Sequence, residues 1–309
     1  MESGGRRRRA FSSLAGNTAL LRVLAAYLLF ILTEYAVWIA MLVFAYNRGG
    51  AAVAGLVAVA QLAPAAVVAP VAASLADRRS PVVMLAGGYL TQVAGMAGTA
   101  AAIGAGTPLA AYAAAVVAST AVTTTRPAQS ALIPSLATTP DQLTAANVVA
   151  GWLEAAGAAA AGLLVGVLIS LAGVGSVFAV CAGLGLAAAL LVAGLRAPSL
   201  AADADADAST AGVAEGLRLA VRQPRLRLML ALLTADAVVV GALDLLVVIL
   251  ALTVLGRPPS WAGYLEFAFG AGAVLAATVS ALLVGLAQMS ARRGAAVGWK
   301  QVTGRKPPK

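Results

Sequence analysis

Acidic side chains interrupt several stretches of sequence that are otherwise apolar, and four of them are candidates for a functional role. Glu34, Glu154, Asp236 and Asp244 each lie within a run of mostly hydrophobic residues. An ionised side chain at membrane depth costs roughly 2.5–3.5 kcal/mol on insertion scales, so each of them needs a physical reason to be there. Groups in this position bind protons, bind cationic ligands, or hydrogen-bond to a neighbouring helix.

Glu34 and the two aspartates are the candidates for proton coupling or substrate binding. Glu34 lies midway along the first apolar run, and an apolar cavity disfavours the charged form of a carboxyl, so it can bind and release protons near neutral pH. Asp236 and Asp244 lie about 80° apart around a helix, toward the same side. They could bind a cation, relay protons or pair with arginines. Glu154 lies near one end of its run, which favours a structural role close to water.

The chain lacks the residues on which most enzyme and metal sites depend. It contains no His and a single Cys, Cys181. A disulfide within the chain, a zinc or copper site built from His or Cys, and Ser-His-Asp or Cys-His catalysis are therefore excluded. We expect no enzymatic activity, no metal and no cofactor.

The composition places the chain in a membrane. Hydrophobic residues make up 61% of it and charged residues 11%, with a mean hydropathy of +0.92, whereas soluble domains have roughly 45–50% and 25%. A helix that spans a bilayer needs about 20 mostly apolar residues. Eight such runs predict an all-α integral membrane protein, and they cover residues 23–46, 53–75, 81–103, 109–125, 145–171, 174–195, 226–254 and 262–286.

The basic residues indicate how these helices are oriented. If the N-terminus is cytoplasmic, all 21 Lys and Arg residues except Arg48 and Arg257 fall in cytoplasmic segments. This asymmetry follows the positive-inside rule, and it predicts a multi-pass protein of the plasma membrane with both termini in the cytoplasm. The net charge of +9 then comes from basic segments on the cytoplasmic side of the lipid bilayer, so no nucleic-acid partner is expected.

The order of the segments predicts six helices, a linker and two further helices. The linker contains an alternation of Ala and Asp that is typical of flexible polar segments. The expected parts are a basic cytoplasmic N-terminus at 1–22, a six-helix bundle at 23–195, a cytoplasmic linker at 196–225, two helices of a second bundle at 226–286 and a basic cytoplasmic tail at 287–309.

Six helices, a cytoplasmic linker and a restart of the same pattern resemble the major facilitator superfamily, and three motifs add to the resemblance. Residues 126–134 resemble the segment between helices 4 and 5 of its bacterial drug-efflux and siderophore-exporter branch. Residues 157–162 are similar to its antiporter motif. The loop at 73–80 looks like its signature loop and matches it at Leu75, Ala76, Asp77 and Arg78.

The resemblance covers about residues 22–286 and implies two six-helix bundles with the substrate path between them. This chain would supply the first bundle and two helices of an incomplete second one, as in a C-terminally truncated protein. Glu34 would be the proton-coupling group of helix 1. A conformational gate would contain Asp77, Arg78 and Arg126. At the inner end of helix 4, Arg126 would pair with Asp77 or Glu154, or alternatively serve only as a positive-inside anchor. Side chains that could line the cavity are Tyr35, Trp38, Gln61 and Gln92.

We therefore expect a secondary active transporter that exports small hydrophobic or cationic compounds in exchange for protons, by alternating access around a site near the midplane. Its partners would be the small-molecule substrate, protons and the lipid bilayer. The alternative is a truncated remnant that does not transport, or one subunit of a split transporter whose partner supplies the missing helices. A half-built second bundle would leave polar helix faces against lipid, which is costly.

Overall fold

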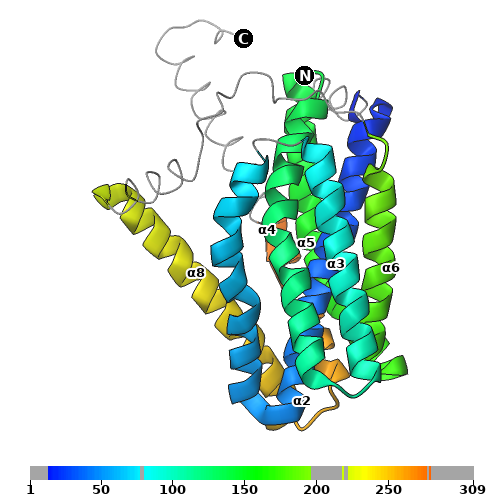
Figure 1. Ribbon diagram of the computed structural model, residues 1–309, viewed down its shortest axis with the longest axis vertical. Coiled ribbons are helices and arrows are strands. Elements are labelled where there is room, and N and C mark those ends of the chain that lie inside the picture. Colours follow the sequence, from blue (N-terminus) through cyan, green and yellow to red (C-terminus); the bar gives the residue numbers. More distant parts are fainter. Residues whose placement is uncertain (1–12, 77–79, 196–217, 219–221, 277, 280–309) are drawn as a thin grey trace, which may run out of the picture.

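A computed structural model of the protein describes residues 13–76, 80–195, 218, 222–276, 278 and 279. Every regular element within these residues is a helix (Figure 1). This confirms the expected all-α membrane bundle, and each of the eight expected spans has a helical counterpart. The elements are α2 (Thr18–Ala76), α3 (Pro81–Gly104), α4 (Pro108–Leu136), α5 (Pro140–Ala172), α6 (Val174–Val192), α8 (Pro224–Ile249), a π-helical turn (Leu250–Val254) and a helix over residues 260–276.

The longest helix, α2, consists of two membrane spans joined at a sharp bend. Within α2, the stretch Thr18–Pro64 alone has 47 residues and is apolar enough to cross a membrane. That corresponds to about 70 Å of helix, more than twice the roughly 30 Å of a bilayer core. Gly49 and Gly50 depart from helical geometry, and the φ of 64° at Gly50 lies in the left-handed region that favours glycine. The chain turns back at this bend, so the two arms run in opposite directions (Figure 1).

The first arm of α2 is the buried centre of the bundle. Helices α4, α5 and α6 all pack against α2, and α3 packs against both α4 and α6. Small residues permit this close approach. A Cβ built at Gly95 of α3 would lie 2.8 Å from the carbonyl oxygen of Ala114 in α4. In a bilayer, where apolar burial hardly favours association, close backbone packing of this kind holds helices together.

Polar side chains at the start of α2 hold it to the ends of two neighbouring helices. Nδ2 of Asn17 donates a hydrogen bond of 2.9 Å to the carbonyl oxygen of Leu136, the last residue of α4. Nε and Nη2 of Arg22 donate bonds of 2.8 Å to the carbonyl oxygens of Leu191 and Ala193 at the end of α6. Carbonyl groups at helix ends lack helical partners, so these bonds satisfy them and fix this end of the bundle.

Helix α4 continues past the point where the sequence suggested that it ends. We expected it to end near Thr125, before Arg126 and Pro127, but it runs to Leu136 with Pro127 and Pro134 inside it. A proline removes one backbone donor. Ending the helix inside a bilayer would leave several backbone groups unpaired, which costs more. Arg126 is consequently well inside a long helix.

Helix α8 meets the bundle mainly at the end where α2 bends. There Val248 and Ala251, in and just after α8, pack in one cluster with Leu42 and Val43 of α2. Toward its own N-terminal end, α8 leans away from the other helices (Figure 1), and most of its large apolar side chains are exposed. The linker expected before it lies almost entirely outside the described residues, as does the whole of the expected tail at 287–309.

The helix over residues 260–276 packs closely against α5. A Cβ built at Gly263 would lie 2.6 Å from the carbonyl oxygen of Gly162 and 2.9 Å from the Cα of Gly166. Gly162 is the last residue of the segment that is similar to the antiporter motif. Gly157, the first residue of that segment, packs instead against Ile31 of α2. The segment therefore lies between the first span and the last described helix.

Candidate functional site

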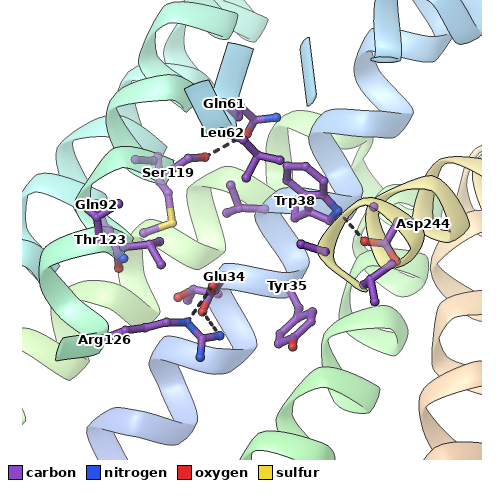
Figure 2. Close-up of a pocket in the computed structure, with 18 of the residues that line it drawn as sticks. Glu34, Tyr35, Trp38, Gln61, Leu62, Gln92, Ser119, Thr123, Arg126 and Asp244 are labelled. Carbon is purple, nitrogen blue, oxygen red and sulfur yellow. Dashed lines mark hydrogen bonds and ion pairs between the residues drawn. The ribbon is translucent and has the colours of Figure 1, made fainter. Parts of the chain in front are cut away.

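A cavity of about 670 Å³ lies between α2, α3, α4 and α8 (Figure 2). Many of its lining side chains are apolar, among them Val37, Leu62 and Met96. The gate candidates Asp77 and Arg78 lie outside the described residues. All other residues that we expected at proton, substrate, gate or cavity positions line this one space: Glu34, Tyr35, Trp38, Gln61, Gln92, Arg126, Asp236 and Asp244.

Glu34 and Arg126 form an ion pair with two hydrogen bonds in the wall of the cavity (Figure 2). Nη2 of Arg126 donates to Oε2 of Glu34 over 2.8 Å, and Nε donates to Oε1 over 3.2 Å. This forked arrangement is the strongest geometry for an arginine and a carboxylate. The guanidinium also lies over the ring of Phe30, 5.7 Å from its centroid. Each of these contacts lowers the cost of placing a charge at membrane depth.

One of the two expected partners of Arg126 is present, and Glu34 is an additional partner that the sequence did not indicate. We expected Arg126 at the inner end of helix 4, paired with Asp77 or Glu154. Glu154 does contact it, with 3.4 Å between Nη1 and Oε1, but the two shorter bonds go to Glu34. The reason is the continuation of α4 past Pro127, which places Arg126 beside the middle of the first arm of α2.

Glu154 belongs to the same group of charges, although the sequence favoured a structural role near water for it. Its Oε2 accepts a hydrogen bond of 3.0 Å from the hydroxyl of Tyr27. Tyr27 was not among our candidates. A signal for it exists, because Tyr27 precedes Glu34 by about two helical turns and so faces the same side of α2. We call Tyr27, Glu34, Arg126 and Glu154 the charge cluster.

The opposite wall of the cavity comes from α8. Oδ2 of Asp244 accepts a hydrogen bond of 2.8 Å from Nε1 of Trp38, which links α8 to the first arm of α2 (Figure 2). Asp236 lines the same cavity. Glu266, on the helix over residues 260–276, interacts electrostatically with Asp244 and was also not among our candidates. The criterion that selected the other acids, a charge inside an apolar run, would have selected Glu266 too.

A polar corner of the cavity is formed by Gln61 and Ser119 (Figure 2). Oγ of Ser119 donates a hydrogen bond of 3.0 Å to Oε1 of Gln61. Nε2 of Gln61 is buried and has no hydrogen-bond partner among the described residues. Because an unpaired buried donor is costly, this corner would be stabilised by a ligand or water molecule that offers an acceptor atom.

Together these groups can bind protons and cations. Carboxyl groups of Glu34 and Asp244 border an apolar space, which suits reversible protonation and the attraction of positive charge. Among the described residues, no three His, Cys, Asp or Glu side chains are grouped closely enough to hold a metal ion.

Comparisons with known proteins show one family and a similar fold. The family described as Major Facilitator Superfamily matches residues 23–299. A peptide transporter POT, whose crystal structure is in complex with sulfate, has a TM-score of 0.51 at 17% identity, over 77% of this chain and 51% of that one. A POT family transporter in complex with a thioalcohol conjugated peptide has a TM-score of 0.44 at 11% identity, over 76% and 50%. No curated protein matches the sequence.

These comparisons bear on the fold and on the extent of the chain. At 17% identity, the likeness to the first solved structure shows the fold alone. The chain spans about half the length of the two solved transporters. The family match extends past Leu286, where the expected resemblance ended.

Proposed function

The chain belongs to the Major Facilitator Superfamily, and we propose that it is a secondary active transporter that exports small hydrophobic or cationic compounds in exchange for protons. Its apolar helices and its family make it a multi-pass membrane protein. The observation that carries the proposal is the ion pair of Glu34 and Arg126 in the wall of the cavity. Two charges at this depth are costly, and a proton-coupling role explains why they are present.

Proton coupling follows from the chemistry of the ion pair. A proton that binds Glu34 removes the negative charge that holds Arg126, so the guanidinium is then free to pair fully with Glu154. The contact between α2 and α4 at the cavity wall weakens as a result. A charge change of this kind favours one of two arrangements of the helices over the other, which is how alternating access can be driven.

The other wall of the cavity supports binding of a cation. Asp236 and Asp244 place two carboxyl groups on α8, and Tyr35 and Trp38 place two aromatic side chains on α2. Carboxylates attract a positive charge, and aromatic faces add cation–π attraction. The volume of about 670 Å³ is in the ordinary range for small-molecule sites. We therefore propose lipophilic cations as the best substrates.

The distribution of basic residues supports the orientation that we propose, with both termini in the cytoplasm. The contact of α8 with α2 would then close the external side of the cavity. The hydroxyls of Tyr46 and Thr253 share a hydrogen bond at this contact. We assign the loop that contains Asp77 and Arg78 to gating at the cytoplasmic side, on the resemblance of that loop alone.

Reconstitution of the full chain into lipid vesicles tests the proposal. Vesicles are loaded with ethidium, a lipophilic cation, and a pH gradient is imposed across the membrane. We expect ethidium efflux together with opposite proton movement, followed by a pH-sensitive dye inside the vesicles. A protonophore should stop both. If the parent chain moves neither ethidium nor protons beyond protein-free vesicles under gradients of either direction, the proposal is wrong.

Asp244→Asn separates cation recognition from general binding. The Asn side chain keeps an acceptor for Trp38 Nε1, but the negative charge is lost. We expect the KM for ethidium to rise about tenfold, which corresponds to about 1.4 kcal/mol, while the KM for an uncharged hydrophobic substrate changes little. The matched control is Asp141→Asn, because Asp141 is exposed in the first turn of α5. An equal rise of KM for both substrates would count against a role of Asp244 in charge recognition.

A further inference from the structure

A second, smaller pocket lies beside the charge cluster. Its volume is about 180 Å³, and Arg126 lines both it and the large cavity. On α4, the lining residues of the small pocket follow Arg126 toward the end of the helix. The small pocket therefore lies on the side of the charge cluster where α2 begins and α4 ends. Its lining residues are Tyr27, Arg126, Gln129, Ser130, Ile133, Asn147 and Ala150.

Gln129 gives this pocket a buried donor that lacks an acceptor. The side chain is only 2% exposed, and its Oε1 accepts a hydrogen bond of 3.4 Å from the hydroxyl of Tyr89. Its Nε2 has no partner among the described residues. Buried amide donors are nearly always paired with protein or water. A pocket that is polar and has room for several water molecules supplies such a partner.

The charges around the pocket favour water over an anion as its occupant. Arg126 is the one basic group of the charge cluster, and it is shared by the carboxylates of Glu34 and Glu154. When both acids are ionised, the cluster carries a surplus negative charge, which repels anions and attracts protons. Within the cluster, Glu154 of α5 interacts electrostatically with groups on two other helices. These groups are Tyr27, Glu34 and Tyr35 on α2, and Arg126 on α4.

Tyr27 connects the small pocket to Glu154. Its side chain lines the pocket, and its hydroxyl donates a hydrogen bond of 3.0 Å to Oε2 of Glu154. A phenolic hydroxyl donates one hydrogen bond and can accept another. Water in the pocket can therefore bond to the Tyr27 oxygen while that hydroxyl remains bonded to the carboxylate, which makes a continuous path for a proton.

We propose that the small pocket is a water-filled chamber through which the charge cluster exchanges protons, and that Glu154 is the carboxyl at which this exchange takes place. The inference rests on the proposed function and deepens it, because it adds a second acidic group to the coupling site. Glu34 would take a proton on the side of the large cavity, and Glu154 would release it on the side of the small pocket.

The two steps balance as proton transfers without any change of oxidation state. In the first, the O–H bond of protonated Glu34 breaks and the proton reaches the Glu154 carboxylate through water, leaving Glu34 ionised. In the second, the Tyr27 hydroxyl turns away from the now neutral carboxyl and donates a hydrogen bond to a pocket water. Neutral Glu154 then gives its proton to the Tyr27 oxygen while the Tyr27 hydroxyl gives its own proton to that water. The products are hydronium, ionised Glu154 and neutral Tyr27. Arg126 pairs with Glu154 while Glu34 is protonated, with Glu34 while Glu154 is protonated, and with both once both are ionised.

Transport by Glu154→Gln and Tyr27→Phe tests the roles of these residues. Both variants are close in shape to the parent, and Phe keeps the ring of Tyr27 that stacks on Phe30. In reconstituted vesicles we expect proton-driven ethidium efflux to fall at least about tenfold in each variant. Exchange of ethidium across vesicles without a pH gradient should fall by less than about twofold, because it needs no net proton transfer.

Thiol chemistry tests the chamber itself. Cys181 is the only cysteine and is buried, so Cys181→Ala provides a background without reactive thiols. In this background we compare Gln129→Cys with Thr125→Cys, which lies one turn earlier on α4, is equally buried and does not line the pocket. We expect a charged, membrane-impermeant methanethiosulfonate to modify Gln129→Cys at least about tenfold faster, since a thiol reacts as the hydrated thiolate. Asn147→Cys, on the other wall of the pocket, should also react.

Each outcome decides between the inference and a specific alternative. If Glu154→Gln loses exchange and proton-driven efflux equally, Glu154 only stabilises the structure and the inference is wrong. If proton-driven efflux is unchanged in Glu154→Gln while the parent is proton-coupled, the inference is wrong but the proposed function stands. Equal protection of the cysteines at 129, 147 and 125 would show that the pocket is dry. A parent chain that moves no protons would overturn both proposals.

Discussion

Glu34→Gln is expected to abolish proton-driven efflux and to leave the chain folded. Glutamine cannot bind and release a proton near neutral pH, so the coupling step is lost. Arg126 still has Glu154 as a partner, at 3.4 Å, so no unpaired buried cation results. We expect the efflux rate under a pH gradient to fall by more than about tenfold, equal to about 1.4 kcal/mol in the coupled step. Ethidium efflux from reconstituted vesicles is the measurement.

Two controls make the result for Glu34→Gln specific. Exchange of ethidium without a pH gradient should persist, because it requires the cavity and not the proton. Asp141→Asn removes an exposed acid at the start of α5 and should behave as the parent. If Glu34→Gln still couples efflux to protons, Glu34 is not the coupling group. If it loses exchange and elutes as aggregate, its carboxylate is needed for folding.

Gly263→Ala is expected to destabilise the protein strongly, although it adds only one methyl group. The added Cβ would lie 2.6 Å from the carbonyl oxygen of Gly162 and 2.9 Å from the Cα of Gly166. Both neighbours are backbone atoms, so α5 and the helix over residues 260–276 would have to move apart. Overpacking of this kind costs about 1–3 kcal/mol. We expect a lower Tm for the purified protein, measured by the intrinsic fluorescence of its tryptophans.

The same helix offers a matched control for Gly263→Ala. A Cβ built at Gly272 meets no heavy atom within 4 Å. Gly272→Ala should therefore be neutral or slightly stabilising, since alanine favours a helix over glycine by about 1 kcal/mol. An unchanged Tm in Gly263→Ala would mean that the close approach of these two helices does not contribute to stability. An equal decrease in both variants would mean that the loss of stability does not come from the close contact at Gly263.

Much of the fold could be predicted because a bilayer imposes a simple rule on the sequence. A spanning segment must be long, apolar and helical, so apolar runs mark helices. The run expected at 81–103 corresponds to α3, which the structure gives as Pro81–Gly104. The end of α4 was predicted wrongly because Arg126 and Pro127 break such a run. The helix continues through both. Arg126 pairs with two carboxylates, and ending the helix at Pro127 would leave several backbone groups unpaired in the membrane.

The residue types of the site could be predicted, but their partners could not. Charge inside an apolar run singles out Glu34, Asp236 and Asp244, and all three line one cavity. Nothing in the spacing of the sequence shows that Glu34 meets Arg126, which is 92 residues away. For a related reason Tyr27 was missed, and Glu154 was assigned only a structural role near water. Their importance comes from the hydrogen bond between them, and such a bond exists only once α2 and α5 are packed together.

The sequence by itself determined that this is an all-helical membrane protein with costly acids at membrane depth, because hydropathy and charge are properties of each segment alone. Only the tertiary structure decided which charges meet. It brought Glu34, Arg126 and Glu154 from three helices into one cluster, and it set the cluster between a large cavity and a small polar pocket. The physical reason is that ion pairs and cavities depend on how helix faces pack against one another, and close backbone contacts such as those at Gly95 and Gly263 set that packing.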